Sequence, residues 1–281
     1  MKIVSCFRDV SEIEPLAEAG ASEFYCGLDG VPDFAWAGLP DLRTLAAAVR
    51  KAHSLGRRIA LAVNSIVLRD SGKWSCRRLA ARLAEIDRMG IDAFIVANPS
   101  LFPMLEGRRL KAGFHLSSVQ PCFNSMAVDY FRRFGVTRVI LPSQLRADEA
   151  GGILALCRRH GIETEVFDPR FFGCVYVNGR CKLHPPLLHT RRSEPGCGLF
   201  CGAGAWERLS ARPLGSRAAP LLDRLKKRLR GRKADGMAQL FDFYAAGVGY
   251  LKYGTRMDSL RTKVMKVSRM RETLRLLSEG R

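Results

Sequence analysis

The sequence lacks an apolar run long enough to cross a membrane. No stretch approaches about 18 consecutive apolar residues, and the first residues show no long apolar core followed by a small-residue cleavage site. We therefore expect a cytoplasmic protein without a transmembrane segment. Disulfides are uncommon in the reducing cytosol, so the nine cysteines, an odd number, favour metal ligation or redox chemistry.

Acidic residues are scarce relative to basic ones. The chain has 27 Asp and Glu against 46 Lys and Arg, a formal net charge of +19. Nineteen of the basic residues but only seven acidic ones fall within residues 206–281. This surplus fits a polyanionic partner such as RNA, and it fits equally well a solvated helical face in an arginine-rich chain.

Several catalytic motifs are also absent. Residues 5–9, which follow the first predicted strand, contain no glycine, and this disfavours a doubly wound sheet with a phosphate-binding loop. Neither the His-Glu-x-x-His motif of metallopeptidases nor the Gly-x-Ser-x-Gly motif of serine hydrolases occurs.

Short apolar, β-branched runs alternate with amphipathic stretches along most of the chain. Strands are predicted at residues 2–5, 23–27, 58–64, 93–97, 113–117, 138–141, 163–167 and 250–253. Helices are predicted to end at glycines shortly before the next strand, namely Gly20, Gly56, Gly90, Gly135 and Gly161. Eight such strands predict an α/β fold, a single (β/α)8 TIM-type barrel domain that spans residues 1–281.

The alternation is interrupted once, between the seventh and eighth predicted strands. The connection holds a cysteine-rich insertion at residues 173–206 and a basic helical segment at residues 207–248 within the same domain. Leucines gather on one face of the predicted helix 221–230, which favours packing against the barrel, with the charges outward. A further helix is predicted at residues 236–246.

The insertion carries four cysteines with the spacing C-x6-C-x15-C-x3-C, which are Cys174, Cys181, Cys197 and Cys201. Four thiolates suit either a tetrahedral zinc ion or an iron–sulfur cluster, and the spacing does not choose between them. Cys174 follows the seventh strand closely, at the end of the barrel where active sites are built. We predict a metal centre on these four residues.

Side chains at the carboxyl ends of barrel strands face the substrate. His115 is the best proton-handling candidate, with a hydrogen-bonded core histidine as the alternative. Lys252 and Arg256 could bind a carboxylate or phosphate, or form salt bridges inside the barrel mouth. By position, Glu165 is a further candidate, as are Cys26, Asn64, Asn98, Ser117, Gln120, Gln144 and Asp168.

The segment Gly-Cys-x4-Asn-Gly-Arg-Cys at 173–181, preceded by Glu-Val-Phe at 165–167, resembles the signature of peptidase family U32, the collagenase-like proteins. The Cys197-x3-Cys201 pair and residues 17–28, 114–118 and 250–257 extend this resemblance over nearly the whole chain. It implies a [4Fe-4S] cluster on the four cysteines and oxygen-independent hydroxylation, as in ubiquinone biosynthesis or RNA modification. The substrate would be a quinone precursor or an RNA base, and a small carboxylate would donate the oxygen.

Three acid, base or cation positions depart from the family pattern, at residues 143–144, 169–170 and 253–255. These changes leave open a role as the cluster-holding subunit of a hydroxylase that includes a second U32-type subunit. One alternative is a collagenase-like peptidase, whose nucleophile would be Cys26 or Cys122 near His115. Another is a noncatalytic, zinc-bearing protein that binds RNA or acts as a scaffold.

Overall fold

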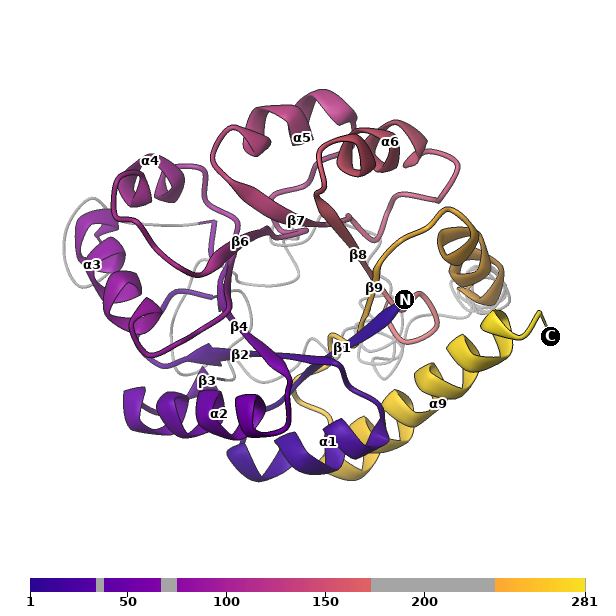
Figure 1. Ribbon diagram of the computed structural model, residues 1–281, viewed down its shortest axis with the longest axis horizontal. Helices are drawn as coiled ribbons and strands as arrows, with labels where there is room; N and C mark the ends of the chain where they lie inside the picture. Colours follow the sequence, from indigo (N-terminus) through magenta and orange to yellow (C-terminus); the bar gives the residue numbers. More distant parts are fainter. Residues whose placement is uncertain (34–37, 67–74, 173–235, 281) are drawn as a thin grey trace, which may run out of the picture.

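The computed structural model describes residues 1–33, 38–66, 75–172 and 236–280. Eight parallel strands form the centre of the fold, and β1 pairs with both β2 and β9, which closes the sheet into a barrel (Figure 1). The strands are β1 (Lys2–Cys6), β2 (Glu23–Leu28), β4 (Arg58–Val63), β5 (Ala93–Val96), β6 (Gly113–Leu116), β7 (Val136–Ile140), β8 (Glu163–Phe167) and β9 (Tyr250–Lys252). The predicted TIM-type barrel is therefore confirmed.

Helices surround the barrel, as Figure 1 shows. They are α1 (Ile13–Ala19), α2 (Leu42–Ser54), α3 (Cys76–Asp87), α4 (Leu101–Leu105), α5 (Ser125–Arg132), α6 (Gly151–Arg159), a helix at residues 236–245 and α9 (Leu260–Ser278), with a 3-10 turn at Val10–Glu12 before α1. Most strand residues are apolar and buried, as expected when helices cover a parallel sheet.

Local sequence explains where the helices begin and end. The side chains of Asp41, Asn124 and Ser259 accept hydrogen bonds from backbone N–H groups in the first turns of α2, α5 and α9. All five glycines predicted as helix ends have a positive φ, including Gly20 at 121° and Gly161 at 64°. These angles strain residues with a Cβ atom, so glycine is needed there to turn the chain toward the next strand.

The long connection lies where the sequence predicted it, between β8 and β9. After β8 the residues 168–172 make a turn, and Gly236 resumes the chain against it: a Cβ atom on Gly236 would lie 3.0 Å from the carbonyl oxygen of Pro169. The described residues on either side of segment 173–235 therefore lie close together beside the carboxyl end of β8. The four insertion cysteines and residues 207–235 of the basic segment lie outside the described residues.

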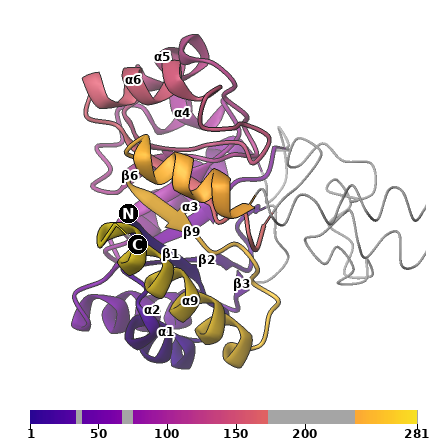
Figure 2. The same ribbon diagram turned by 90° about the vertical axis from the view of Figure 1, so that its right-hand side faces the viewer.

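Two features were not predicted. A two-residue strand, β3 (Gly38–Leu39), pairs with β2 outside the closed barrel. Helix α9 runs beside α1 on the outside of β1 (Figures 1 and 2), and the buried ammonium of Lys263 contacts Glu12 at 2.6 Å. Within the described ranges, no helix combines the length and apolar character that crossing a membrane requires.

Candidate functional site

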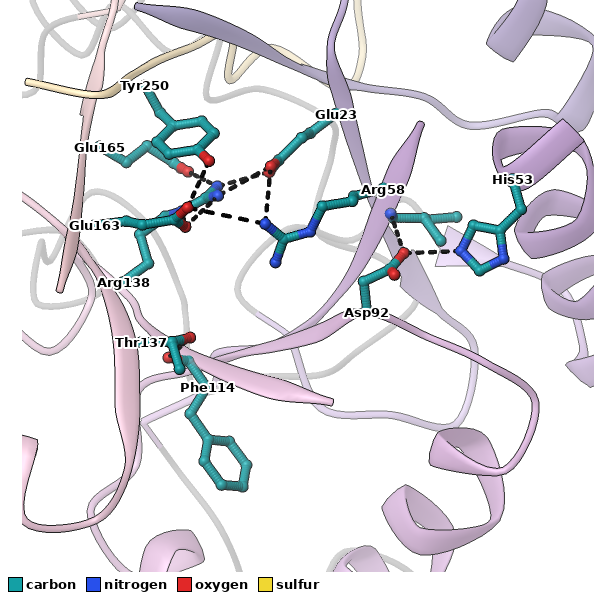
Figure 3. Close-up of polar contacts among 11 residues, drawn as sticks. Glu23, His53, Arg58, Asp92, Phe114, Thr137, Arg138, Glu163, Glu165 and Tyr250 are labelled. Atoms are coloured by element: carbon teal, nitrogen blue, oxygen red, sulfur yellow. Dashed lines mark hydrogen bonds and ion pairs between the residues drawn. The ribbon is translucent and has the colours of Figure 1, made fainter. Parts of the chain in front are cut away.

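The barrel interior contains a charged network where such barrels usually hold branched apolar side chains. Arg138 projects from the middle of β7 and has a fully buried guanidinium, which donates to Glu23, Glu163 and Glu165 (Figure 3). The N–O distances are 2.7 Å to Glu23, 2.6 Å to Glu163 and 2.9 Å to Glu165. Because β2 and β7 lie on opposite sides of the closed barrel, the Arg138–Glu23 pair spans the interior.

Most of this network belongs to the amino end of the barrel. Glu23 and Glu163 are the first residues of β2 and β8. The hydroxyl of Tyr250 donates to Glu163 at 2.6 Å, and the Arg138 guanidinium lies 3.4 Å from the Tyr250 ring centroid. Arg58, at 46% side-chain exposure, contacts Glu23 at 3.4 Å from the solvent side. Polar clusters at this end of such barrels usually serve stability.

Glu165 connects this network to the carboxyl half of the barrel. One of its oxygens accepts from Arg138, and the other accepts from the ammonium of Lys252 at 2.6 Å. Burial alone would raise the pKa of Glu165, but Lys252 and Arg138 outweigh it, and the pKa lies below its ordinary value. Burial lowers the pKa of Lys252, and the neighbouring Glu165 only partly offsets this. Lys252 is thus an ammonium that releases its proton more readily than a surface lysine does.

Two cations approach one aromatic ring at the carboxyl end of the barrel. The Lys252 ammonium lies 4.0 Å, and the Arg256 guanidinium 5.2 Å, from the ring centroid of Tyr25. Arg256 donates to the carboxylate of Asp33 at 2.5 Å, and both side chains are largely buried. Of the two uses foreseen for Lys252 and Arg256, salt bridges within the mouth are the ones observed.

His115 lies in β6, beside Arg138 in the strand register. It is buried, and its Nε2 atom has no hydrogen-bond partner among the described residues. Burial, followed by the charges of Arg138 and Lys252, lowers the pKa of His115 well below its ordinary value. The imidazole is therefore neutral at pH 7. It can form a hydrogen bond, but it is not an imidazolium that could act as a general acid.

The remaining positional candidates mainly support loops. Asn64 donates to Ser117 at 3.2 Å, and Asn98 donates to the carbonyl of Ile66 at 2.9 Å. Asp168 forms an ion pair with Arg170 at 2.5 Å. The backbone amide of Asp168 also donates to the carbonyl of Lys252 at 2.9 Å, next to the group formed by Glu165, Lys252 and Arg256, which the structure brings together.

The cysteines in the described part of the chain do not form a reactive centre. Cys26 and Cys122 are buried, and burial raises the pKa of each thiol to about 12. At neutral pH they are thiols rather than nucleophilic thiolates. Across residues 1–33, 38–66, 75–172 and 236–280, no three His, Cys, Asp or Glu side chains gather so as to hold a metal ion. The predicted metal centre depends on cysteines outside these ranges.

Sequence reasoning missed four members of the interior network: Glu23, Asp33, Arg138 and Glu163. A signal existed for Arg138, since it interrupts the apolar strand Val136–Ile140. Glu23 and Glu163 are the first residues of strands that are otherwise mostly buried. The strand register directs both side chains into the barrel. A charge of one sign inside a buried strand predicts a charge of the other sign facing it.

Comparisons with known proteins identify the family of the chain. The family model for Peptidase family U32 matches residues 8–281. The curated "tRNA hydroxylation protein P" of Haemophilus influenzae is 28% identical over 159 residues, 57% of this chain and 32% of that protein. Its Escherichia coli counterpart is 26% identical over 159 residues, 57% of this chain and 33% of that protein. The match thus spans about a third of the relatives' length.

Among solved structures, that of a U32 peptidase is similar at 14% identity and a TM-score of 0.47, covering 59% of this chain and 68% of that one. The family match covers almost the whole of the described barrel together with the cysteine-rich insertion. The chain belongs to peptidase family U32.

Proposed function

We propose that this protein performs, or supports as one subunit, the oxygen-independent hydroxylation of an RNA base. The observation that carries this proposal is its distant relationship to tRNA hydroxylation protein P. The basic surplus of the chain supports an RNA substrate, because lysine and arginine neutralise backbone phosphates. A quinone precursor is the second substrate class that the same chemistry would serve.

The proposed cofactor is a [4Fe-4S] cluster on Cys174, Cys181, Cys197 and Cys201. Four thiolates are the donor set that such a cluster requires, and zinc on the same residues is the alternative. When bound, the cluster would carry the electrons that leave the substrate as it is hydroxylated. Its position is supported by chain order, since the cysteine-rich segment begins directly after the turn 168–172 at the carboxyl end of β8.

The side chains of the barrel mouth would bind and orient the small molecule that donates oxygen. Lys252 and Arg256 offer positive charge to a carboxylate, and Arg256 can hold it through two parallel N–H bonds. Glu165 keeps the Lys252 ammonium in place through its 2.6 Å hydrogen bond. His115, neutral and with an unpartnered Nε2 among the described residues, would exchange a hydrogen bond with substrate. A second U32-type subunit would complete the site.

Proteolysis, the activity in the family's name, receives less support. A cysteine peptidase needs a thiolate beside a base, whereas burial keeps Cys26 and Cys122 protonated. A noncatalytic scaffold would bind RNA in a salt-dependent manner and show no turnover.

Anaerobic purification of the wild type and of Cys197→Ala tests the cofactor. We expect about four iron and four sulfide per wild-type chain, with visible absorption that the variant lacks. Cys157→Ala is the matched control, because Cys157 is a buried free cysteine in α6 and is not one of the four proposed ligands. Zinc alone, or no metal, in the wild type would refute the redox proposal.

The substrate is tested in cells that lack this protein. Mass spectrometry of nucleosides from total tRNA and ribosomal RNA should show one base that has lost an oxygen atom, and re-expression should restore it. Cys157→Ala should restore it as well, and Cys197→Ala should not. Unchanged RNA together with an accumulated quinone precursor would refute the RNA substrate and favour a quinone precursor.

A further inference from the structure

Each cation at the barrel mouth is paired with a carboxylate of the chain itself. Lys252 is paired with Glu165 at 2.6 Å, and Arg256 with Asp33 at 2.5 Å. The Arg256 side chain is only 4% exposed. A guanidinium this deeply buried needs an anion beside it, because an unpaired buried charge is strongly unfavourable.

The two carboxylates differ in how firmly they are held. Glu165 lies in the middle of β8, is 1% exposed and is shared between Lys252 and Arg138. Asp33 lies instead in the connection between β2 and β3, beyond the carboxyl end of its strand, and its side chain is 9% exposed. Asp33 is therefore the more accessible of the two carboxylates.

The backbone around Asp33 is anchored. The amide of Asp29 donates to the carbonyl of Leu39 at 2.8 Å, and the amide of Ser65 donates to the carbonyl of Pro32 at 3.3 Å. Because these bonds hold residues 29–32 on the barrel, rotation of the Asp33 side chain can remove the carboxylate from Arg256 without opening the barrel. The exchange of one carboxylate for another at Arg256 is thus a local event.

We propose that Asp33 is a built-in competitor: its carboxylate occupies the place at Arg256 that the carboxylate of a small ligand takes during function. The ligand must displace Asp33, so Asp33 sets how tightly, and how selectively, the mouth binds carboxylates. The Tyr25 ring contacts both cations and would border this place. This inference rests on the proposed use of a small carboxylate as oxygen donor.

The test measures binding of malonate, a small dicarboxylate, to the anaerobically purified full-length protein by titration calorimetry at constant ionic strength. Asp33→Asn removes the competing charge and nearly preserves the shape. We expect its Kd for malonate to fall at least about tenfold relative to the wild type. In Asp33→Asn/Arg256→Gln the gain should disappear, because the guanidinium that receives the ligand is gone.

Asp29→Asn is the matched control. It removes the same charge from the same connection, but Asp29 is exposed, and we expect its affinity to stay within about threefold of the wild type. Equal gains in Asp29→Asn and Asp33→Asn, or no gain in Asp33→Asn, would overturn the inference. Should Asp33→Asn fail to fold, Asp33→Ser is a second uncharged variant that carries the same expectation and the same criterion.

The binding test can fail without the cofactor test failing, and the reverse also holds. Malonate binding is read without turnover, so failure of the competitor inference leaves the iron and sulfide measurement untouched. Conversely, if the protein contains no iron but Asp33→Asn binds malonate more tightly than the wild type, the role of Asp33 is supported and the redox function is refuted.

Discussion

Replacing Arg138 with methionine should destabilise the barrel more than any surface charge change. Arg138 donates to three carboxylates, those of Glu23, Glu163 and Glu165, and its guanidinium is inaccessible to water. Methionine fills much of the space but leaves these carboxylates without their shared cation. Leaving a buried charge uncompensated costs about 3–5 kcal/mol. That is a large part of the roughly 5–15 kcal/mol by which domains are stable.

Not all three carboxylates contribute equally to this loss. Glu165 is buried and keeps Lys252 as a partner, and Glu23 keeps the half-exposed Arg58. Glu163 is 35% exposed, so solvent already screens its charge. The lower part of the range, about 3 kcal/mol, is therefore the expected cost at pH 7.

The cost should depend on pH with a definite sign. In the wild type burial would raise the pKa of Glu163 and that of Glu165, but Tyr250 at Glu163, Lys252 at Glu165 and, after these, Arg138 at both outweigh burial and hold each pKa below its ordinary value. The stability they contribute is present above the pKa of the unfolded chain, roughly 4.3, and is lost as pH falls through the folded pKa. In Arg138→Met burial favours the protonated carboxyls, so the difference from the wild type should shrink toward pH 4.

Urea denaturation followed by circular dichroism at pH 7, 5 and 4 measures this difference. Arg275→Met is the control, since Arg275 makes exposed ion pairs with Glu272 and Glu279 on α9 and should change little. A loss below about 1 kcal/mol at pH 7, or a loss that does not vary with pH, would refute the assigned role of Arg138 as the central cation of the barrel.

Two further changes test single sites. His115 is neutral in the folded barrel, so below the unfolded pKa of about 6.5 the unfolded chain takes up a proton that the folded one does not. The wild type should then lose up to about 1.4 kcal/mol per pH unit relative to His115→Gln, and parallel urea stabilities from pH 7 to 5.5 would contradict this. In Gly254→Ala the new Cβ would lie 2.6 Å from the Phe167 ring, which stacks on Phe172, so we expect a loss of about 1–3 kcal/mol. In Gly249→Ala the new Cβ would lie 3.6 Å from the carbonyl oxygen of Thr164, an ordinary contact, so this variant should be tolerated; equal melting temperatures of the two variants would argue against the ring's close packing.

The barrel could be predicted because its signals are local. Each strand is a short apolar run, and glycines with positive φ separate helices from strands at the predicted places, as at Gly56 and Gly90. β3 could not be predicted, because two residues carry no periodicity and Gly38–Leu39 pairs only through its position beside β2. Helix α9 begins after Ser259, whose side chain caps it. Its basic composition indicated a charged segment and did not predict its packing beside α1.

The site was predicted only in part because ion pairs connect residues far apart in sequence. Glu165, Lys252, Arg256 and His115 were identified from their places near strand ends, and the first three form one contact group. Asp33 and Arg138 were missed, since their importance depends on partners more than a hundred residues away, Arg256 and Glu23. The low pKa of His115 also depends on neighbours that only the closed barrel brings together.

The strand register explains how the charged network at the amino end of the barrel is connected to the cations at its carboxyl end. Glu165 aligns with Tyr250, and Phe167 aligns with Lys252, so successive inward residues of β8 step from the amino end toward the mouth. Glu165 lies between Glu163 and Phe167 on the inward face of β8. One of its carboxylate oxygens accepts from Arg138 and the other accepts from Lys252. The charge state of the lysine at the mouth is therefore tied to the network that holds the barrel closed below it. A ligand that neutralises Lys252 would weaken its hold on Glu165 and leave that carboxylate to Arg138, so binding at the mouth and stability at the amino end are coupled through one carboxylate.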